Sequence, residues 1–135
     1  MPSARCSEPA EDAALRLLKA YWEADLPGAL AACAPAATIA LPPSAPFPSP
    51  APIATVLPQI FARVYSRFVG GRCEVAIDRC LTSGSTVMVE YTARGDLVTG
   101  DGFVCQYLAV LEIENGKVAG WRAYTDTKYV ADKLL

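Results

Sequence analysis

The chain has 135 residues, of which 53% are apolar and 19% charged, and its formal net charge is −2. This composition is typical of a folded domain with one core and excludes an intrinsically disordered chain. The small negative charge, without a basic cluster, argues against nucleic-acid binding. No apolar run approaches the roughly 20 residues that span a bilayer.

Three further features narrow the classes of function. The first residues, MPSARCSEPAED, contain no apolar signal core, so we expect a cytoplasmic protein. Five cysteines without a C-x-x-C pair are typical of reduced, mostly buried thiols. The chain has no histidine, which excludes Ser-His-Asp triads, Cys-His pairs and His-ligated metals. We therefore expect no metal and no cofactor, with any acid–base chemistry carried by carboxyl, tyrosine, lysine or cysteine groups.

The first half of the chain has helical periodicity. Apolar residues on one stripe predict a surface helix over 10–25 that begins near Ser7-Glu8-Pro9 and ends at Pro27-Gly28. A short second helix is expected over 29–34 and a brief strand over 38–41. Residues 42–52, PPSAPFPSPAP, hold six of the 11 prolines and predict an extended loop. A third helix begins between Thr55 and Pro58 and ends at Gly70-Gly71.

The second half has alternating periodicity. It predicts strands over 73–82, 85–98, 102–114 and 117–126, joined by turns at Ser83-Gly84, 99–102 and Asn115-Gly116. A final helical segment is expected over 128–135. Helices followed by an antiparallel meander predict an α+β fold with the helices on one face of the sheet.

Strand parity sorts the side chains between the two faces. On the second of these strands one face carries Met88, Glu90, Thr92, Arg94 and Asp96. On the third strand one face carries Phe103, Cys105, Tyr107, Ala109 and Leu111. Parity does not decide which face the helices cover.

This order of elements, with Arg94-Gly95-Asp96 and the segment ENGKVAGWRAYTD, resembles the nuclear-transport-factor-2-like superfamily, and within it the SnoaL-like and limonene-epoxide-hydrolase-like branch. The resemblance implies a single domain over 1–135, in which a cone-shaped, curved antiparallel sheet is wrapped by three N-terminal helices around an apolar cavity. It also implies that loop 42–52 lies near the pocket mouth and that two copies form a homodimer through the outer sheet face.

The resemblance also implies roles for single residues. Arg94 and Asp96 match the arginine and the first aspartate of the epoxide-hydrolase trio, and both would point into the cavity. The second aspartate of that trio falls on Ala123, and the two residues that hold the attacking water fall near Thr38 and Ala40. These departures argue against epoxide hydrolysis by the family's mechanism.

We therefore expect a small metal-free enzyme that binds an apolar, cyclic molecule and carries out isomerisation, cyclisation or water addition. Asp96 would move the proton, Arg94 would orient it, and Tyr107 would donate a hydrogen bond to the substrate. The expected pocket residues are Trp22, Tyr65, Cys105, Trp121 and Ala123. Two alternatives stay open: Arg94 and Asp96 form a structural ion pair, or the domain is a non-catalytic module that binds a small ligand or a partner protein. Arg122 and Asp126 are expected to be structural, with Asp126 capping the final helix.

Overall fold

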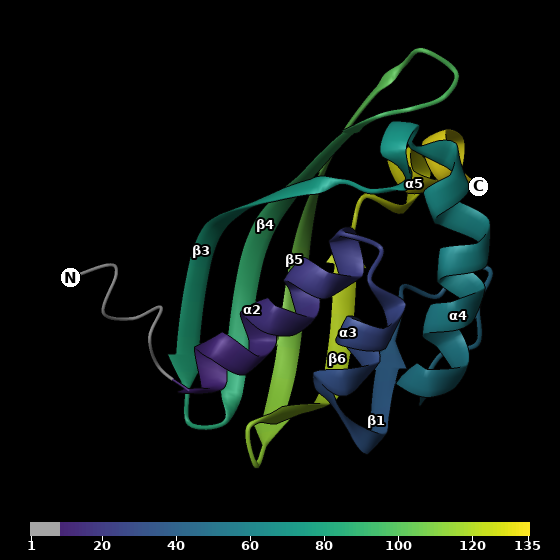
Figure 1. Ribbon diagram of the computed structural model, residues 1–135. Helices are drawn as coiled ribbons and strands as arrows, with labels where there is room; N and C mark the ends of the chain where they lie inside the picture. The colour runs from purple at the N-terminus through teal and green to yellow at the C-terminus, as the bar shows by residue number, and fades with distance from the viewer. Residues whose placement is uncertain (1–8) are drawn as a thin grey trace.

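The computed structural model describes residues 9–135 and shows helices packed on one side of a curved sheet (Figure 1). The elements in chain order are α2 (Pro9–Trp22), α3 (Leu26–Ala31), β1 (Cys33–Ala40), β2 (Ala51–Pro52), α4 (Ile53–Val64), the 3-10 turns η1 (Tyr65–Arg67) and η2 (Val69–Gly71), β3 (Glu74–Ser83), β4 (Thr86–Asp96), β5 (Gly102–Glu114), β6 (Lys117–Thr125) and α5 (Thr127–Leu134). The expected α+β class is confirmed. The helix start expected at Ser7 and Glu8, and the thiol of Cys6, lie outside the described residues.

The first helix has the predicted buried stripe but a different end. α2 buries Leu17, Leu18 and Trp22 and stops at Trp22, before the expected Pro27-Gly28 signal. These two residues lie instead in the first turn of α3, where Asp25 is the N-cap and its carboxylate accepts a hydrogen bond from the Gly28 amide at 3.0 Å. Proline is tolerated in a first turn because the amides there have no intrahelical partner, so the dipeptide opens a helix instead of closing one.

The proline-rich loop is shorter than predicted, and hydrogen bonds order its two ends. Ala51 and Pro52 form strand β2, which pairs with β1 in antiparallel register, and α4 begins at Ile53, ahead of the predicted start. The Ser49 hydroxyl accepts a hydrogen bond from the Leu41 amide at 2.7 Å and donates one to the Leu41 carbonyl at 3.2 Å. These bonds hold the two ends of the loop together.

The six strands form one sheet in the order β2-β1-β6-β5-β4-β3. Neighbouring strands from β3 to β6 are antiparallel, which confirms the meander. β1 is longer than expected and runs parallel to β6, a pairing that joins the two halves of the chain. At the turn between β5 and β6, Asn115 and Gly116 both have positive φ (51° and 74°), as a two-residue hairpin turn requires.

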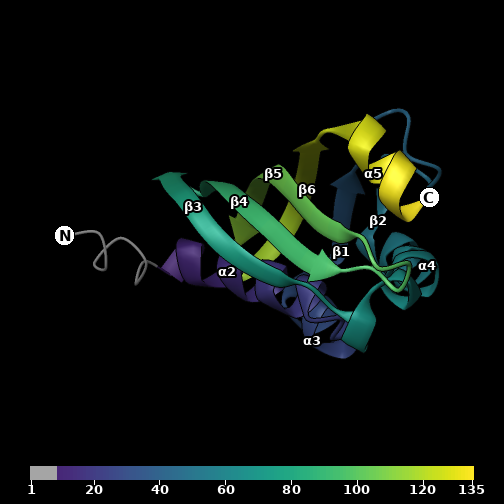
Figure 2. The same ribbon diagram turned by 90° about the horizontal axis from the view of Figure 1, so that it is seen from above.

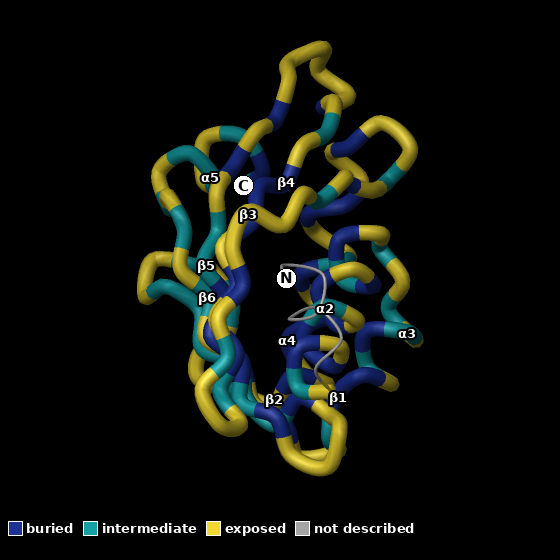
Figure 3. Tube along the Cα trace, turned by 90° about the vertical axis from the view of Figure 1, so that its left-hand side faces the viewer, coloured by how far each residue is buried: buried dark blue, intermediate teal, exposed yellow. Residues whose placement is uncertain are grey.

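The helices cover one face of the sheet and leave the other to solvent. Seen from above, the sheet curves around α2, α3 and α4, while α5 closes the end near β6 (Figure 2). Buried positions, dark blue in Figure 3, lie along the helices and the strands that face them. On β4 the buried residues include Val87, Val89, Tyr91 and Ala93. Within residues 9–135, no helix is long and apolar enough to cross a membrane.

Candidate ligand-binding site

A cavity of about 310 Å³ lies between the inner face of the sheet, α2, α4, the proline-rich loop and α5. Its lining comprises Tyr21, Trp22, Ile39, Leu41, Pro42, Ser44, Ala45, Phe47, Ile60, Val64, Tyr91, Tyr107, Trp121, Ala123, Thr125, Thr127, Lys128, Val130, Ala131, Leu134 and Leu135. The lining residues that are exposed, Ser44, Lys128 and Ala131, show that the mouth opens between the loop and α5. A volume of this size suits a small organic ligand.

The deep wall of the cavity is aromatic. Trp22, at the end of α2, donates a hydrogen bond from Nε1 to the hydroxyl oxygen of Tyr91 at 3.0 Å. The Tyr91 and Tyr107 rings stack with centroids 5.2 Å apart and an interplanar angle of 7°. Tyr21 meets Trp121 edge to face at 5.1 Å. Because these rings hold one another from four different elements, they form a preformed surface for a flat apolar molecule.

The helical repeat of α2 and the alternation along the strands bring these rings to one wall. Tyr21 and Trp22 are neighbours in the last turn of α2, on the side that faces the sheet. Tyr91 and Tyr107 are direct cross-strand partners on β4 and β5, so their side chains rise from the same face. Trp121 lies on β6 opposite Leu111 of β5, a fully buried residue, and therefore also faces inward.

The cavity tyrosines are kept in their protonated form. Burial raises the pKa of Tyr91 above its usual range, and the hydrogen bond from Trp22 offsets this only in part. Burial also raises the pKa of Tyr107, with Cys105 and Tyr91 adding to the effect. Burial likewise raises the pKa of Tyr21, against a smaller lowering by the side chain of Tyr65. At neutral pH these hydroxyls can donate hydrogen bonds but cannot act as bases.

One donor in this wall has no partner. Trp121 is 3% exposed, and its Nε1 has no hydrogen-bond partner among the described residues. An indole N–H is only a donor, and a buried donor without a partner costs on the order of 1–3 kcal/mol. This N–H is therefore a polar group enclosed within the wall.

Three of the five residues expected in the pocket, Trp22, Trp121 and Ala123, line the cavity, and so does Tyr107. The other two, Tyr65 and Cys105, are buried just behind the wall. The Tyr65 hydroxyl donates to the backbone carbonyl of Tyr21 at 2.5 Å, and the Cys105 sulfur lies 3.1 Å from the hydroxyl oxygen of Thr125. Both groups hold the wall in place and neither lines the cavity.

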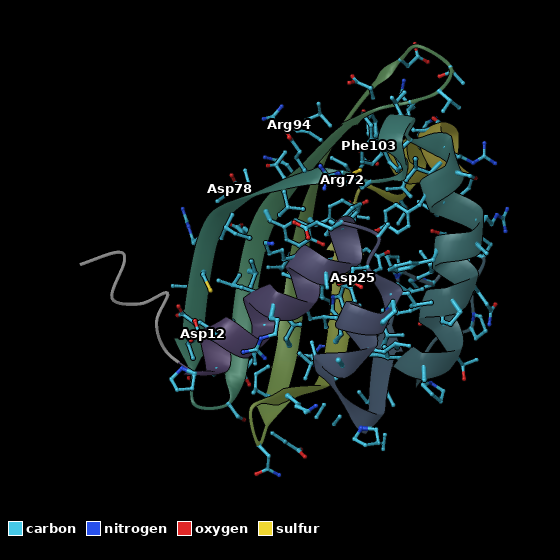
Figure 4. All side chains as sticks on the ribbon, in the orientation of Figure 1. Asp12, Asp25, Arg72, Asp78, Arg94 and Phe103 are labelled. Carbon is cyan, nitrogen blue, oxygen red and sulfur yellow. The ribbon has the colours of Figure 1, made fainter. Side chains whose placement is uncertain are left out.

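Arg94 and Asp96 lie on the other face of the sheet, and the expectation that they point into the cavity is wrong. The register pairs Ala93 with the inward-facing Cys105, whereas Arg94 pairs with Val104 and Asp96 with Gly102. Arg94, Asp96 and Val104 are all exposed. Figure 4 shows Arg94 at the outer margin of the sheet, away from α2 and α4. Side chains alternate between the two faces along a strand, and the buried apolar residues of β4 have odd numbers. Arg94 and Asp96 have even numbers and therefore point to the opposite face.

Arg94 and Asp96 instead border a surface depression together with Arg72 and Glu74. Arg94 and Asp96 do not form an ion pair with each other among residues 9–135. The structure therefore does not support the alternative of a structural ion pair. Their expected catalytic role stays a prediction, without support from their position.

Two residues expected to be structural do have structural contacts. The carboxylate of Asp126 accepts a hydrogen bond from the Tyr129 amide at 3.1 Å and caps the start of α5. The guanidinium of Arg122 lies 3.9 Å from the carboxylate of Glu112 across the outer face. No residue of the cavity lining in the described part of the chain is acidic, and residues 9–135 contain no group of three or more Cys, Asp or Glu placed to hold a metal ion.

Sequence reasoning missed Tyr21 and Tyr91 as cavity residues, and it also missed Lys128. The signal for Tyr91 was available, because it has the opposite parity to the charged Glu90 and Arg94. Lys128 carried no comparable signal, since a lysine in a terminal helix is usually solvated.

The fold and the cavity together define a protein of the nuclear-transport-factor-2-like class, in which a curved sheet and its helices enclose a pocket. Residues 14–121, most of the chain, match the SnoaL-like domain family. The chain belongs to this family, which confirms the resemblance noted in its sequence. No curated protein sequence matches the chain significantly.

Solved structures agree on the fold. TerC, co-crystallised with polyporic acid, has 16% identity and a TM-score of 0.74, with 94% of this chain and 98% of that chain covered. A protein from Jannaschia sp. CCS1 that is named as a SnoaL-like polyketide cyclase has 17% identity and a TM-score of 0.68 over 93% of this chain and 91% of that chain. An epoxide hydrolase of the LEH-like type from M. tuberculosis has 22% identity and a TM-score of 0.68 over 93% and 89%.

Proposed function

We propose that this protein binds an apolar, cyclic small molecule in the cavity between α2, α5 and the inner sheet face. The observation that carries the proposal is the aromatic wall in which Tyr91 stacks on Tyr107 and Trp22 packs edge-on against Tyr91. Such a wall offers a flat ring system both burial and ring contacts. The co-crystallisation of the similarly folded TerC with polyporic acid supports a ligand of this kind.

The ligand carries at least one acceptor oxygen, such as a carbonyl. Tyr107 is a protonated donor in the cavity wall. A ligand oxygen within reach of its hydroxyl would accept a hydrogen bond, which polarises a carbonyl in a water-poor site. We therefore propose for Tyr107 the hydrogen-bonding role that the sequence predicts.

The residues of the cavity favour ligand binding over acid–base catalysis. Proton abstraction needs a base within reach of the ligand, and no residue in the described lining of this cavity has an acidic side chain. The non-catalytic alternative is therefore the better supported of the two. Catalysis through Asp96 remains testable: Asp96→Asn should abolish turnover if that residue is the base, and unchanged turnover would remove it.

Intrinsic fluorescence gives a direct test of binding, because both tryptophans of the chain, Trp22 and Trp121, line the cavity. Titration with 2-acetylnaphthalene, a neutral ring ketone, should quench this fluorescence saturably. Ala123→Phe fills the cavity and should abolish the quenching, whereas the exposed variant Asp96→Asn should leave it unchanged. Absence of saturable quenching, or equal quenching in Ala123→Phe with intact circular dichroism, would contradict the proposal.

We also propose that two copies pair through the outer sheet face, as the resemblance implies. A row of apolar side chains crosses this face from Leu81 on β3 through Met88 on β4 to Val110 on β5, because these residues are successive cross-strand partners. Leu81 and Met88 are 55% and 45% exposed. A row of this kind on a solvent face favours contact with a second apolar surface.

A further inference from the structure

The cavity changes character from its deep end to its mouth. The deep wall consists of buried rings and aliphatic groups such as Trp22, Tyr91 and Ile39. The hydroxyl groups of Ser44, Thr125 and Thr127 come from half-buried or exposed positions on the proline-rich loop and around the start of α5. The site is therefore amphipathic, with its aliphatic hydroxyls gathered toward the mouth.

Lys128 has the one charged side chain in the described lining of the cavity. It follows Thr127 in the first turn of α5, whose start is fixed by the Asp126 cap. Its ammonium group contacts the carboxylate of Asp132 at 2.8 Å, and the two side chains are 85% and 62% exposed. An exposed i,i+4 pair of this kind contributes little free energy, so a ligand anion can compete for Lys128.

The other charges near this helix do not compete for the same position. Lys133 lies 3.9 Å from the carboxylate of Asp101 in the β4–β5 turn and 5.9 Å from the centroid of the Tyr129 ring. It is not part of the cavity lining. The negative groups that act on Lys128 are Asp132 and, more weakly, Asp126.

We propose that the ligand of this cavity is an amphipathic acid, with a ring system against the aromatic wall and a carboxylate at the mouth bound by Lys128. This inference rests on the proposed ligand-binding function and adds the chemical class of the ligand. The hydroxyls of Ser44 and Thr127 complete the polar surroundings of the carboxylate. Lys128 is thus a specificity-determining residue.

Calorimetric titration with two probes of the same shape tests this inference. One is 2-naphthylacetate, which is anionic, and the other is 2-naphthylacetamide, which is neutral. The wild-type protein should bind the acid about two- to fivefold more tightly, the range for an ion pair at an exposed site. The preference should decline as salt rises to about 0.5 M.

Three variants distinguish the effect of Lys128 on affinity from the effects of the neighbouring charges. Lys128→Met should bind the acid and the amide with equal affinity. Asp132→Asn frees the lysine and should increase the preference. Lys133→Met removes a positive charge from the same helix without touching the cavity and should change neither affinity.

The outcomes distinguish this inference from the proposal on which it rests. Equal binding of acid and amide by the wild-type protein, or equal losses in Lys128→Met and Lys133→Met, would overturn the role of Lys128 and leave the cavity proposal standing. Binding of neither probe would overturn both.

Discussion

The indole nitrogen of Trp22 donates a hydrogen bond to the hydroxyl of Tyr91 across 3.0 Å, and thereby ties the end of α2 to the middle of β4. Both residues are buried and 69 positions apart in the chain. Because the bond forms part of the cavity wall, it couples the stability of the fold to the shape of the site.

Loss of the Tyr91 hydroxyl should destabilise the protein. In Tyr91→Phe the ring stays in place, but Trp22 Nε1 becomes a buried donor without a partner, which costs about 1–3 kcal/mol. Urea unfolding should show this decrease in the free energy of unfolding. The matched control is Tyr124→Phe, since Tyr124 is 50% exposed on the outer face; a loss of similar size there would contradict the explanation.

A side chain at position 95 would be too close to buried neighbouring side chains. A Cβ atom there would lie 2.9 Å from the Phe68 ring and 3.2 Å from the sulfur of Cys73, and both of these side chains are buried. We expect Gly95→Ala to lower the free energy of unfolding by about 1–3 kcal/mol through overpacking. Gly102→Ala, where the added atom meets nothing within 4 Å, should cost well under 1 kcal/mol.

Stability should fall in mildly alkaline solution because of two thiols. Burial raises the pKa of Cys73 from 9.0 to about 12, and burial, opposed by Lys117, raises that of Cys33 to about 11. The folded chain holds these protons more tightly than the unfolded chain. Their contribution is therefore complete below about pH 9 and is lost as the pH rises through about 11 and 12.

Urea unfolding between about pH 8 and pH 10 measures this effect. Each thiol should account for about 1 kcal/mol of the decrease over that interval. The double variant Cys33→Ala/Cys73→Ala should show a much flatter dependence, and an equally steep one would contradict the assignment to these thiols. The pH range ends at 10 because, above that pH, the buried tyrosines also contribute to the pH dependence of the free energy of unfolding.

A charge in the apolar row of the outer face should separate the proposed dimer. Met88→Lys places an ammonium group between Leu81 and Val110, where pairing would bury it at a cost of several kcal/mol. Light scattering coupled to size-exclusion chromatography should show a dimer for the wild type and a monomer for the variant. Val98→Lys is the control, because Val98 is 63% exposed in the β4–β5 turn. A wild-type monomer at all concentrations would overturn the dimer.

The sequence by itself determined the elements whose signals are local. The parity of Met88, Glu90 and Arg94 put them on one face of β4, and the Asn115-Gly116 turn fixed a hairpin. Asp126 was recognisable as a helix cap. Together with the resemblance, these signals were sufficient for the α+β class and the family.

Only the tertiary structure decided which face of the sheet is covered and which residues meet there. The register pairs Ala93, and not Arg94, with Cys105, so the charged side of β4 faces solvent and Tyr91 faces the cavity. The parallel pairing of β1 with β6 and the contact of Trp22 with Tyr91 join residues far apart in the chain. Alternation along a strand shows which side chains share a face, but it does not show which face is buried. Burial depends on packing between elements, which the local sequence does not encode.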